Sequence, residues 1–375
     1  MAFKKPTINK TSNSITKLRV YLRAVRKWGK TTLFRDVIEC LYNGDASKGL
    51  LVGVGYEHGY DMLDNLNATH VGDWKELVEL KNWLIKTKGV EHNIEIVAFD
   101  VVDELMPMAE KEVCKQSEIK TKKKCETVNS AFGGYGKGQD RTKELVKSFF
   151  SDLRNAGFGT WAIAHTKDKT IKEKGMTEVE GYMKLTSNLS NSYESVFGDI
   201  FDCVLTGVVD KDVKDGRIVS SVRKLVFRDD GYVEAGCRFT PNAVPEYIVC
   251  PDDSKEMAKL VVETLKEGMR KYQCNPVSKK EFEKLEAKDN EAFINSKIEE
   301  IEEETTAAEV EMEAIDESTT AHSEFDREKA LLLIRKNVKK KGVAELGKDL
   351  LAKEGAASMG DLLDAALKEI VDFIG

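Results

Sequence analysis

The chain lacks several features that would place it in particular classes of protein. No apolar run approaches the length needed to cross a bilayer, and the opening MAFKKPTINKTSNS lacks the apolar core of a signal peptide. We therefore expect a cytoplasmic protein. The seven cysteines are odd in number and include no CxxC spacing, which disfavours both a disulfide framework and a zinc site. The five histidines are scattered without the spacing of metal ligands, so we assign no transition-metal site.

A turn rich in basic residues gives the strongest indication of function. The segment RAVRKWGKTT, Arg23–Thr32, follows the strand-like run LRVYL and ends in the second half of a P-loop motif. In such a turn backbone N–H groups surround a phosphate chain, the lysine reaches the outer phosphates and the hydroxyl reaches a bound Mg²⁺. The predicted nucleotide-binding residues here are Trp28, Gly29, Lys30, Thr31 and Thr32, with Thr31 also a magnesium ligand.

The motif departs from its usual pattern at three positions. Ala24 stands where glycine is usual, and Arg26 and Trp28 stand where small residues or proline are usual. Alanine costs little unless the backbone needs a positive φ, which glycine adopts freely. The alternative interpretation is an ordinary helix N-terminus with incidental basic residues.

Residues 15–250 alternate β-rich runs with helical stretches, which is typical of a parallel α/β sheet. Several of the runs are nearly continuous in apolar residues, as in strands that are buried on both faces. The expected strands are Leu18–Leu22, Gly49–Val54, Ile94–Phe99, Gly159–Ala164, Asp202–Gly207, Val219–Phe227 and Val233–Arg238. The expected helices are Thr32–Leu41, Trp74–Thr87 and Thr142–Ala156.

Acidic residues follow two of these strands. Asp100 follows the run IEIVAF, in the pattern of the carboxylate that holds Mg²⁺ in P-loop proteins, and Asp103 and Glu104 lie just beyond it. Glu57 lies past Gly49–Val54 and is a candidate general base for the attacking water. Alternatively Asp100 only precedes an acidic helix start, and Glu57 belongs to a surface turn.

A strand ending in His165 leads into the lysine-rich segment TKDKTIKEKG. We interpret His165 as a sensor of the γ-phosphate. Cations contact nucleic-acid phosphates without reading sequence, and a glycine-rich loop that mixes aromatic and basic residues suits stacking on single-stranded bases. The candidate nucleic-acid contacts are Lys167, Lys169 and Lys172 after His165, and Lys137 and Arg141 in the glycine-rich loop 130–141. A solvated lysine loop and a mobile glycine connection are the alternatives.

Two arginines late in the core, Arg228 and Arg238, are candidates for arginine fingers that complete a neighbouring subunit's site. The alternative is that they form surface ion pairs with Asp229, Asp230 or Glu234.

Four segments outside the core differ from it in composition. We expect a flexible N-terminus at 1–14, a charged helical extension at 251–297, an acidic disordered linker at 298–325 and a small helical domain at 326–375. The linker is interpreted as a solvated spacer, with a DNA-mimicking tail as the alternative.

The order GKTT, Glu57, AFDVVDEL, AIAHTKDK and AGCRF resembles the phage nucleotide-binding proteins with a RecA-like core, the single-strand annealing or recombination ATPases. The resemblance covers about 15–245. It implies a RecA-like P-loop NTPase fold, ATP and Mg²⁺ as cofactors, and a role in DNA recombination or replication. It also assigns roles to Lys30, Asp100, Glu57 and His165 as above, and matches Lys27 to a lysine common in such P-loops.

Two functions follow as hypotheses. The first is an Mg-dependent ATPase that self-associates as a ring or filament on single-stranded DNA. The second is a nucleotide-dependent protein-interaction switch with weak or no ATPase activity, suggested by the altered P-loop and a separate C-terminal module. A small-molecule kinase fits less well because the sequence shows no clear arginine-rich lid.

Overall fold

The computed structural model describes residues 14–172, 181–272, 290–302 without 292, 330–334 without 332, 342–354 and 364–374. The chain divides into two compact units, Met1–Glu299 and Glu300–Gly375. The predicted flexible N-terminus at 1–14 falls outside the described residues except for Ser14.

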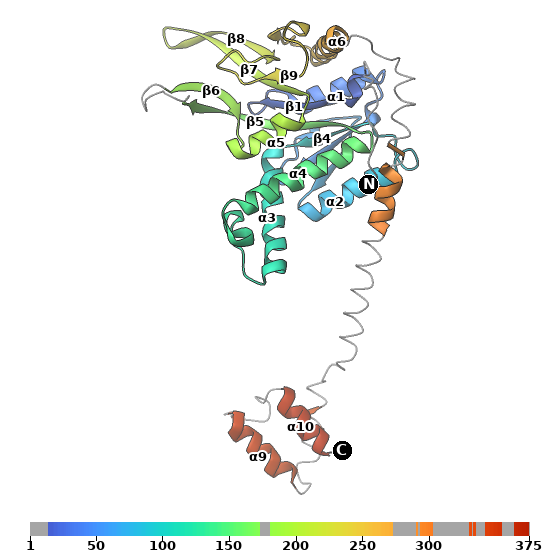
Figure 1. Cartoon of the computed structure of the whole chain (residues 1–375), viewed down its shortest axis with the longest axis vertical. Coiled ribbons are helices and arrows are strands. Elements are labelled where there is room, and N and C mark those ends of the chain that lie inside the picture. Colours follow the sequence, from blue (N-terminus) through green and yellow to red (C-terminus); the bar gives the residue numbers. More distant parts are fainter. Residues whose placement is uncertain are drawn as a thin grey trace. The chain divides into compact units, whose positions relative to one another are not determined.

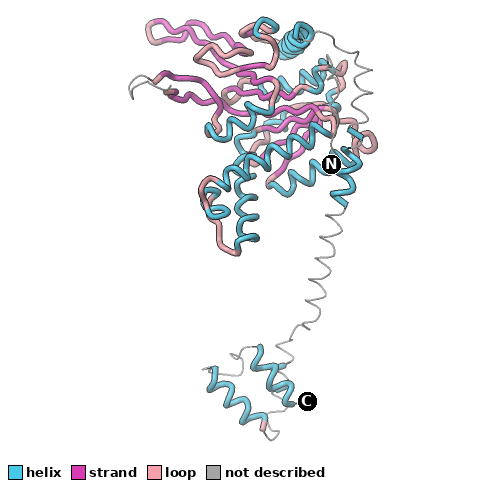
Figure 2. The backbone as a smooth tube through the Cα atoms, in the orientation of Figure 1, coloured by secondary structure: helices cyan, strands magenta, loops and turns pink. Residues whose placement is uncertain are grey.

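The first unit is built around one ten-stranded sheet in the order β10-β8-β7-β1-β5-β4-β2-β3, with β6 paired to β5 and β9 paired to β7 (Figures 1 and 2). The pairings from β7 through β1, β5, β4 and β2 to β3 are parallel, and β6, β8, β9 and β10 pair antiparallel. The expected α/β class with a mainly parallel sheet is thus confirmed. The strands are β1 Arg19–Ala24, β2 Gly49–Val54, β3 Asn67–Val71, β4 Ile96–Asp100, β5 Gly159–Ile171, β6 Tyr182–Ser187, β7 Cys203–Lys214, β8 Arg217–Val226, β9 Gly236–Cys237 and β10 Tyr247–Val249.

Helices cover both faces of this sheet. α1 and α6 pack into one apolar cluster, and α2, α3, α4 and α5 contribute to a second cluster. α1 buries Leu33, Phe34, Val37 and Ile38, the spacing that places apolar side chains on one side of a helix. The helices are α1 Lys30–Leu41, α2 Trp74–Lys86, α3 Val102–Thr121, α4 Lys137–Asn155, α5 Asn191–Ile200 and α6 Ser254–Tyr272.

The structure corrects the prediction that the segment after His165 is a loop. β5 continues to Ile171 and pairs antiparallel with β6, so Lys167 and Lys169 lie on a two-stranded ribbon. The residues of β5 after Ala164 are mostly polar and are exposed or half-buried, so they form no apolar run. The sequence pattern therefore contains no sign that the strand continues to Ile171. For the same reason β3 and β6 were not anticipated; their burial patterns are mostly exposed or half-buried.

The glycine-rich segment is also more ordered than predicted. Val128–Gly133 forms 3₁₀ turns and α4 begins at Lys137, so Lys137 and Arg141 lie on a helix. Together α3, these turns and α4 form a lobe, the α3–α4 lobe, which projects away from the sheet (Figure 1).

The predicted boundary at residue 250 does not hold. Met257, Val261 and Leu265 of α6 are buried in the same cluster as α1, so this segment belongs to the core. Residues 293–302 are helical, including the first five positions of the predicted linker; the rest of it, 303–325, falls outside the described residues.

The second unit contains α9 Val343–Glu354 and α10 Asp364–Ile374. Its own apolar cluster joins Ile334, Val343 and Leu350 to Leu367 and Ile370. Among the described residues of either unit, no helix is both long and apolar enough to cross a membrane.

Candidate nucleotide site

Four parallel strands bring the predicted site residues to one edge of the sheet. Ala24 at the end of β1 pairs with His165 on β5, and Asp100 at the end of β4 pairs with Gly53 on β2. Glu57 follows β2 by three residues. The carboxyl edge of a parallel sheet is where ligands bind in open α/β folds.

The turn between β1 and α1 has the backbone of a phosphate-binding loop. Lys27 has a φ of 61° and Gly29 a φ of 104°, both in the left-handed region. Ala24 is the last residue of β1 and is not among the residues with positive φ, so alanine fits there without backbone strain. The turn presents Gly29, Lys30, Thr31 and Thr32 at the first turn of α1, where unpaired N–H groups attract anions.

Lys30 is buried under this turn, with only 6% of its surface exposed. Its Nζ donates to the carbonyls of Ala24 at 3.2 Å and Val25 at 3.1 Å. Burial lowers the pKa of the Lys30 ammonium, and the nearby Asp100 carboxylate partly opposes that shift. The two carbonyls are neutral dipoles and do not balance the charge of the ammonium. A phosphate that entered the turn would provide a full negative charge beside it.

Trp28 points away from this surface. Its ring lies against Gly207, where an added Cβ would come within 2.5 Å of it, and its Nε1 donates to the Val208 carbonyl at 3.2 Å. Because the side chain is buried on β7, it anchors the turn from below and does not face a nucleotide. The unusual tryptophan is therefore explained by packing of its ring on β7. Its place among the nucleotide-binding residues stays a prediction about the backbone of the turn.

Thr31 and Asp100 meet directly. The Thr31 hydroxyl donates to Oδ2 of Asp100 at 2.8 Å, although the two residues are 69 positions apart. Burial raises the pKa of Asp100 to about 6 despite that hydrogen bond, and the Glu57 carboxylate adds to the rise. A hydroxyl beside a buried carboxylate is an oxygen donor pair of the kind Mg²⁺ takes in phosphate sites, so these residues fit a magnesium ion.

Glu57 and His165 lie around the same point. Glu57 is close enough to affect the pKa values of both Lys30 and Asp100, and its Oε1 accepts from the Gly59 N–H at 2.9 Å. His165 is held by Asp103 on α3: the backbone N–H donates to Oδ2 at 2.9 Å, and Nδ1 lies 3.5 Å from the same oxygen.

Asp103 emerges from the structure as a site residue with a definite partner. The sequence placed it only as a possible assistant to Asp100. Its other oxygen, Oδ1, is buried without a hydrogen-bond partner among the described residues. A buried acceptor without a partner is costly, which indicates a site that a water or a ligand completes.

The predicted basic residues are divided between two projections. Lys137 and Arg141 lie on the α3–α4 lobe, whereas Lys167, Lys169 and Lys172 lie on or just after β5. Lys167 and Lys172 are exposed, but Lys169 donates to the Leu189 carbonyl at 2.5 Å and to Asn191 at 3.2 Å. Lys169 is therefore engaged within its own chain.

The two candidate arginine fingers are also engaged. Arg228 donates to the carbonyls of Cys237, Phe239 and Thr240, so it clamps its own chain and is not available to a neighbour. These contacts count against Arg228 as an arginine finger, which stays a prediction for both arginines. Arg238 is half-exposed, pairs with Asp202 at 3.4 Å and donates to the Asp199 carbonyl.

Comparison with known proteins gives the family of the first unit. Residues 16–229 match the model of the AAA domain family, which is more than half of the chain. The protein therefore belongs to that family, and its first unit is an AAA-type P-loop NTPase domain. No curated protein matches the chain. Among solved structures it is similar to a KaiC-like protein from the archaeon Pyrococcus horikoshii OT3, with 11% identity, a TM-score of 0.34, and 65% of this chain and 100% of that chain covered.

Proposed function

We propose that the first unit binds ATP with Mg²⁺ at the β1–β4 edge and hydrolyses it. The observation that carries this proposal is the 2.8 Å contact between Thr31 and Asp100 beside the buried Lys30. Three residues from two distant segments are already arranged around the space in front of the turn, in the pattern that phosphoryl-transfer sites use.

Each residue has a definite task in this proposal. Lys30 leaves the carbonyls of Ala24 and Val25 and pairs with the outer phosphates. Thr31 and Asp100 would hold Mg²⁺, which would neutralise charge on the phosphate oxygens. Glu57 accepts a proton from the attacking water, and His165, oriented by Asp103, senses the γ-phosphate.

Variants at two residues test nucleotide binding and turnover separately. We expect Lys30→Ala to abolish the calorimetric heat of Mg-ATP binding, whereas Glu57→Gln should keep binding and lose turnover by about 100-fold or more, the usual effect of removing a general base. Lys75→Ala, a surface lysine on α2, is the matched control and should change neither. Normal binding by the Lys30→Ala variant would overturn the proposal.

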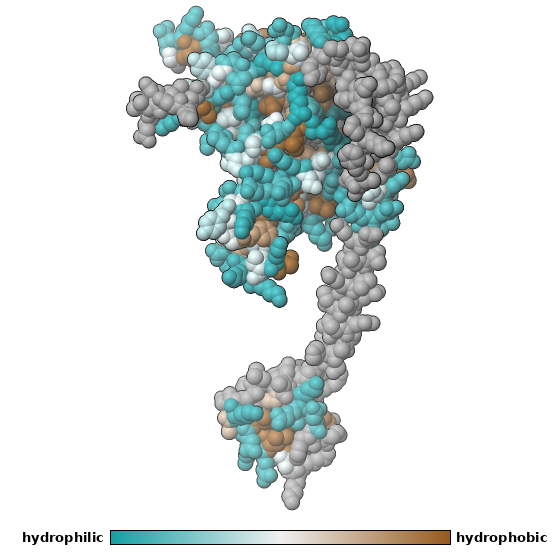
Figure 3. Space-filling model, viewed as in Figure 1, coloured by the Kyte–Doolittle hydropathy of each residue, from teal (hydrophilic) through white to brown (hydrophobic). Residues whose placement is uncertain are grey.

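We also propose single-stranded DNA as a partner, in a recombination, repair or replication role of a phage-encoded protein. The support lies on the α3–α4 lobe, where a groove of about 850 Å³ is lined by Lys120, Lys137, Arg141 and Phe132, with Asp140 and Glu144 among the other lining residues. Tyr135 beside it is 99% exposed, and the lobe's visible surface mixes hydrophilic and hydrophobic residues (Figure 3). Cations and aromatic rings together suit a single strand.

Self-association as a ring or filament is part of the same proposal. Particle mass should rise when Mg-ATP and single-stranded DNA are both present, and DNA should stimulate turnover. A constant monomer mass with equal hydrolysis in the presence and absence of DNA would remove both the assembly and the DNA partner, leaving the nucleotide site untouched.

A second function, a nucleotide-dependent switch for a protein partner, is favoured by one observation. Oε1 of Glu57 already accepts a hydrogen bond from the Gly59 N–H at 2.9 Å, so one of its carboxylate oxygens is engaged within the chain and not with a water. Turnover equal to that of Glu57→Gln, together with tight ATP binding, would select the switch over the ATPase.

A further inference from the structure

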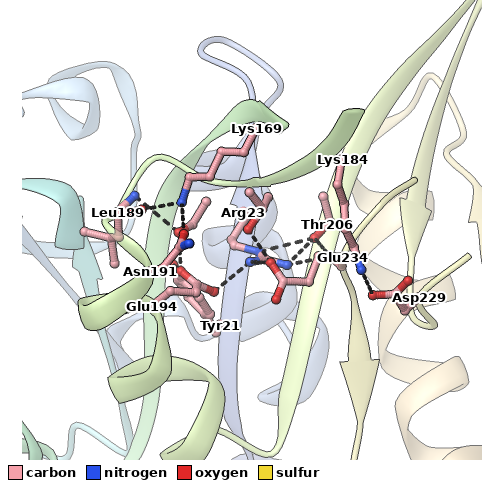
Figure 4. Close-up of polar contacts among 12 residues, drawn as sticks. Tyr21, Arg23, Lys169, Lys184, Leu189, Asn191, Glu194, Thr206, Asp229 and Glu234 are labelled. Atoms are coloured by element: carbon pink, nitrogen blue, oxygen red, sulfur yellow. Dashed lines mark hydrogen bonds and ion pairs between the residues drawn. The ribbon is translucent and has the colours of Figure 1, made fainter. Parts of the chain in front are cut away.

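Arg23 is a buried charge immediately before the nucleotide-binding turn. Its side chain is fully buried on β1, and the next residue, Ala24, supplies a carbonyl that holds Lys30. The guanidinium lies between two carboxylates, Glu194 of α5 at 2.7 Å and Glu234 at 2.9 Å (Figure 4). We call Arg23, Glu194 and Glu234 the ion cluster.

The two carboxylates of the ion cluster also hold the β5–β6 ribbon. The hydroxyl of Thr186 donates to Glu234, and the hydroxyl of Ser187 donates to Glu194. Thr186 and Ser187 are the last two residues of β6. One set of hydrogen bonds therefore joins β1, just before the phosphate turn, to the base of the ribbon.

Backbone contacts support the same connection. Glu234 N–H donates to the Leu185 carbonyl at 3.0 Å, and Leu185 N–H donates to the Tyr232 carbonyl at 2.7 Å, so the segment carrying Glu234 pairs with β6. At the other side of the ribbon, Asn188 N–H donates to the carbonyl of His165 at 2.9 Å. The base of the ribbon is thus attached to both Arg23 and His165.

Stability alone does not account for this arrangement. Desolvating three charges is costly, and well-packed apolar replacements of buried ion groups are often neutral or stabilising. The groups are, however, almost completely satisfied: Arg23 also donates to the Thr206 hydroxyl at 3.1 Å, and the Tyr21 hydroxyl donates to Glu194 at 3.0 Å. A fully satisfied polar network specifies one geometry more sharply than apolar packing does.

We propose that the ion cluster is a positioning link that ties the β5–β6 ribbon to the phosphate turn, so that nucleotide binding changes the ribbon. The inference rests on the proposed nucleotide site. When Lys30 leaves the Ala24 carbonyl for a phosphate, the strand end that carries Arg23 is released from one hydrogen bond, and the ion cluster passes that change to Thr186 and Ser187. Arg23 touches neither phosphate nor metal in this account and acts through its neighbours.

The test is hydrogen exchange of the full-length protein, with and without Mg²⁺ and a non-hydrolysable ATP analogue. In the wild type we expect backbone exchange at 166–171 and 182–187 to change by about tenfold on nucleotide binding, a typical coupling between sites. The variant Arg23→Met/Glu194→Gln/Glu234→Gln removes the charges together, so that no ion is left buried alone. It should bind the analogue, measured by calorimetry, while the exchange of its ribbon stays unchanged.

Two further variants keep the test decisive. Thr170→Val removes the 3.4 Å contact between the Thr170 hydroxyl and Met183 Sδ, farther along the ribbon from Thr186 and Ser187, and should keep the full nucleotide response. Glu234→Gln alone, at a partly exposed side chain, should give a reduced response if the triple variant does not fold. A wild-type response in the triple or in the folded single variant would overturn the inference.

The outcomes separate this inference from the proposed function. Binding of the analogue without any change in the wild-type ribbon overturns the inference alone. Absence of binding by the wild type removes the nucleotide site, and the inference falls with it.

Discussion

At the scale of single residues, Trp28 and Gly207 show how the protein accommodates an unusual P-loop. The tryptophan ring occupies the space that a side chain at Gly207 would need. We expect Gly207→Ala to lower the free energy of unfolding by about 1–3 kcal/mol, the usual cost of overpacking. In a double-mutant cycle, Gly207→Ala should cost about 1 kcal/mol less in the Trp28→Leu background than in the wild type, because neighbouring residues couple. Urea unfolding of the wild type, the two single variants and the double variant measures the coupling.

Gly198→Ala is the matched control for that cycle. It is the same chemical change at a glycine of α5 with no atom within 4 Å of the added Cβ, so stability should stay equal or rise slightly. Strict additivity of Gly207→Ala and Trp28→Leu would contradict the packing account.

The raised pKa of Asp100 leads to a prediction about stability and pH. A carboxyl group whose pKa rises from 3.8 to about 6 on folding stabilises the fold fully below its unfolded pKa, and that contribution is lost as pH rises through 6. Asp100→Asn has no charge to bury. Its unfolding free energy relative to wild type should therefore rise between pH 4 and pH 8, by at most about 3 kcal/mol.

This comparison is made by urea unfolding with EDTA and no nucleotide. A difference between the two proteins that does not vary with pH would show that Asp100 does not titrate in this range. Asp73→Asn, at an exposed carboxyl that caps α2, should show no rise toward alkaline pH, because the pKa of Asp73 is lowered by its backbone hydrogen bonds.

The site was predictable to a different degree at each residue. Lys30, Thr31 and Asp100 follow from short motifs, and the structure brings them together. The partnership of Asp103 with His165 depends on residues 62 positions apart, and no local pattern encodes it. Arg23 is harder still, because its partners Glu194 and Glu234 are 171 and 211 positions away.

At the scale of elements, apolar periodicity predicted what is buried and missed what is exposed. β2 has the predicted bounds Gly49–Val54 because every residue in it is buried. β5 was predicted only as far as its buried half, since the burial pattern turns from buried to exposed after Ala164. An antiparallel ribbon outside the core is stabilised by its backbone pairing, which the sequence pattern does not report.

The two basic projections predict a salt-dependent difference in nucleic-acid binding. Lys137 and Arg141 are exposed on the α3–α4 lobe. The plot of log K against log salt for single-stranded DNA has a negative slope. Replacing both residues with glutamine should make that slope shallower by about 1.4, or about 0.7 for each phosphate that the variant no longer neutralises. Fluorescence anisotropy at four or more salt concentrations gives the slope.

Lys169→Gln is the control for that measurement. Because its Nζ is bound to Leu189 and Asn191, the slope should change little. An unchanged slope in the Lys137→Gln/Arg141→Gln variant would remove the lobe from the proposed DNA surface.

At the scale of the whole molecule, the two compact units differ in their tryptophan content, and so in whether fluorescence can follow their unfolding. All four tryptophans of the chain, Trp28, Trp74, Trp83 and Trp161, lie in the first unit. The first unit also carries every residue of the proposed nucleotide site, whereas the second has its own apolar cluster around Leu367. Tryptophan fluorescence therefore follows the unfolding of the first unit within the intact chain.

This placement gives a whole-chain test of where the nucleotide acts. A ligand that binds only the folded state stabilises it by about 2.7 kcal/mol at 100 times its Kd. We expect Mg-ATP at that concentration to raise the fluorescence-detected Tm of the wild type by several degrees, since the proposed nucleotide site lies in the first unit, at the turn between β1 and α1 and at the end of β4. Lys30→Ala should show no such rise at the same concentration. An equal rise in both proteins would place the nucleotide somewhere other than the turn that follows β1.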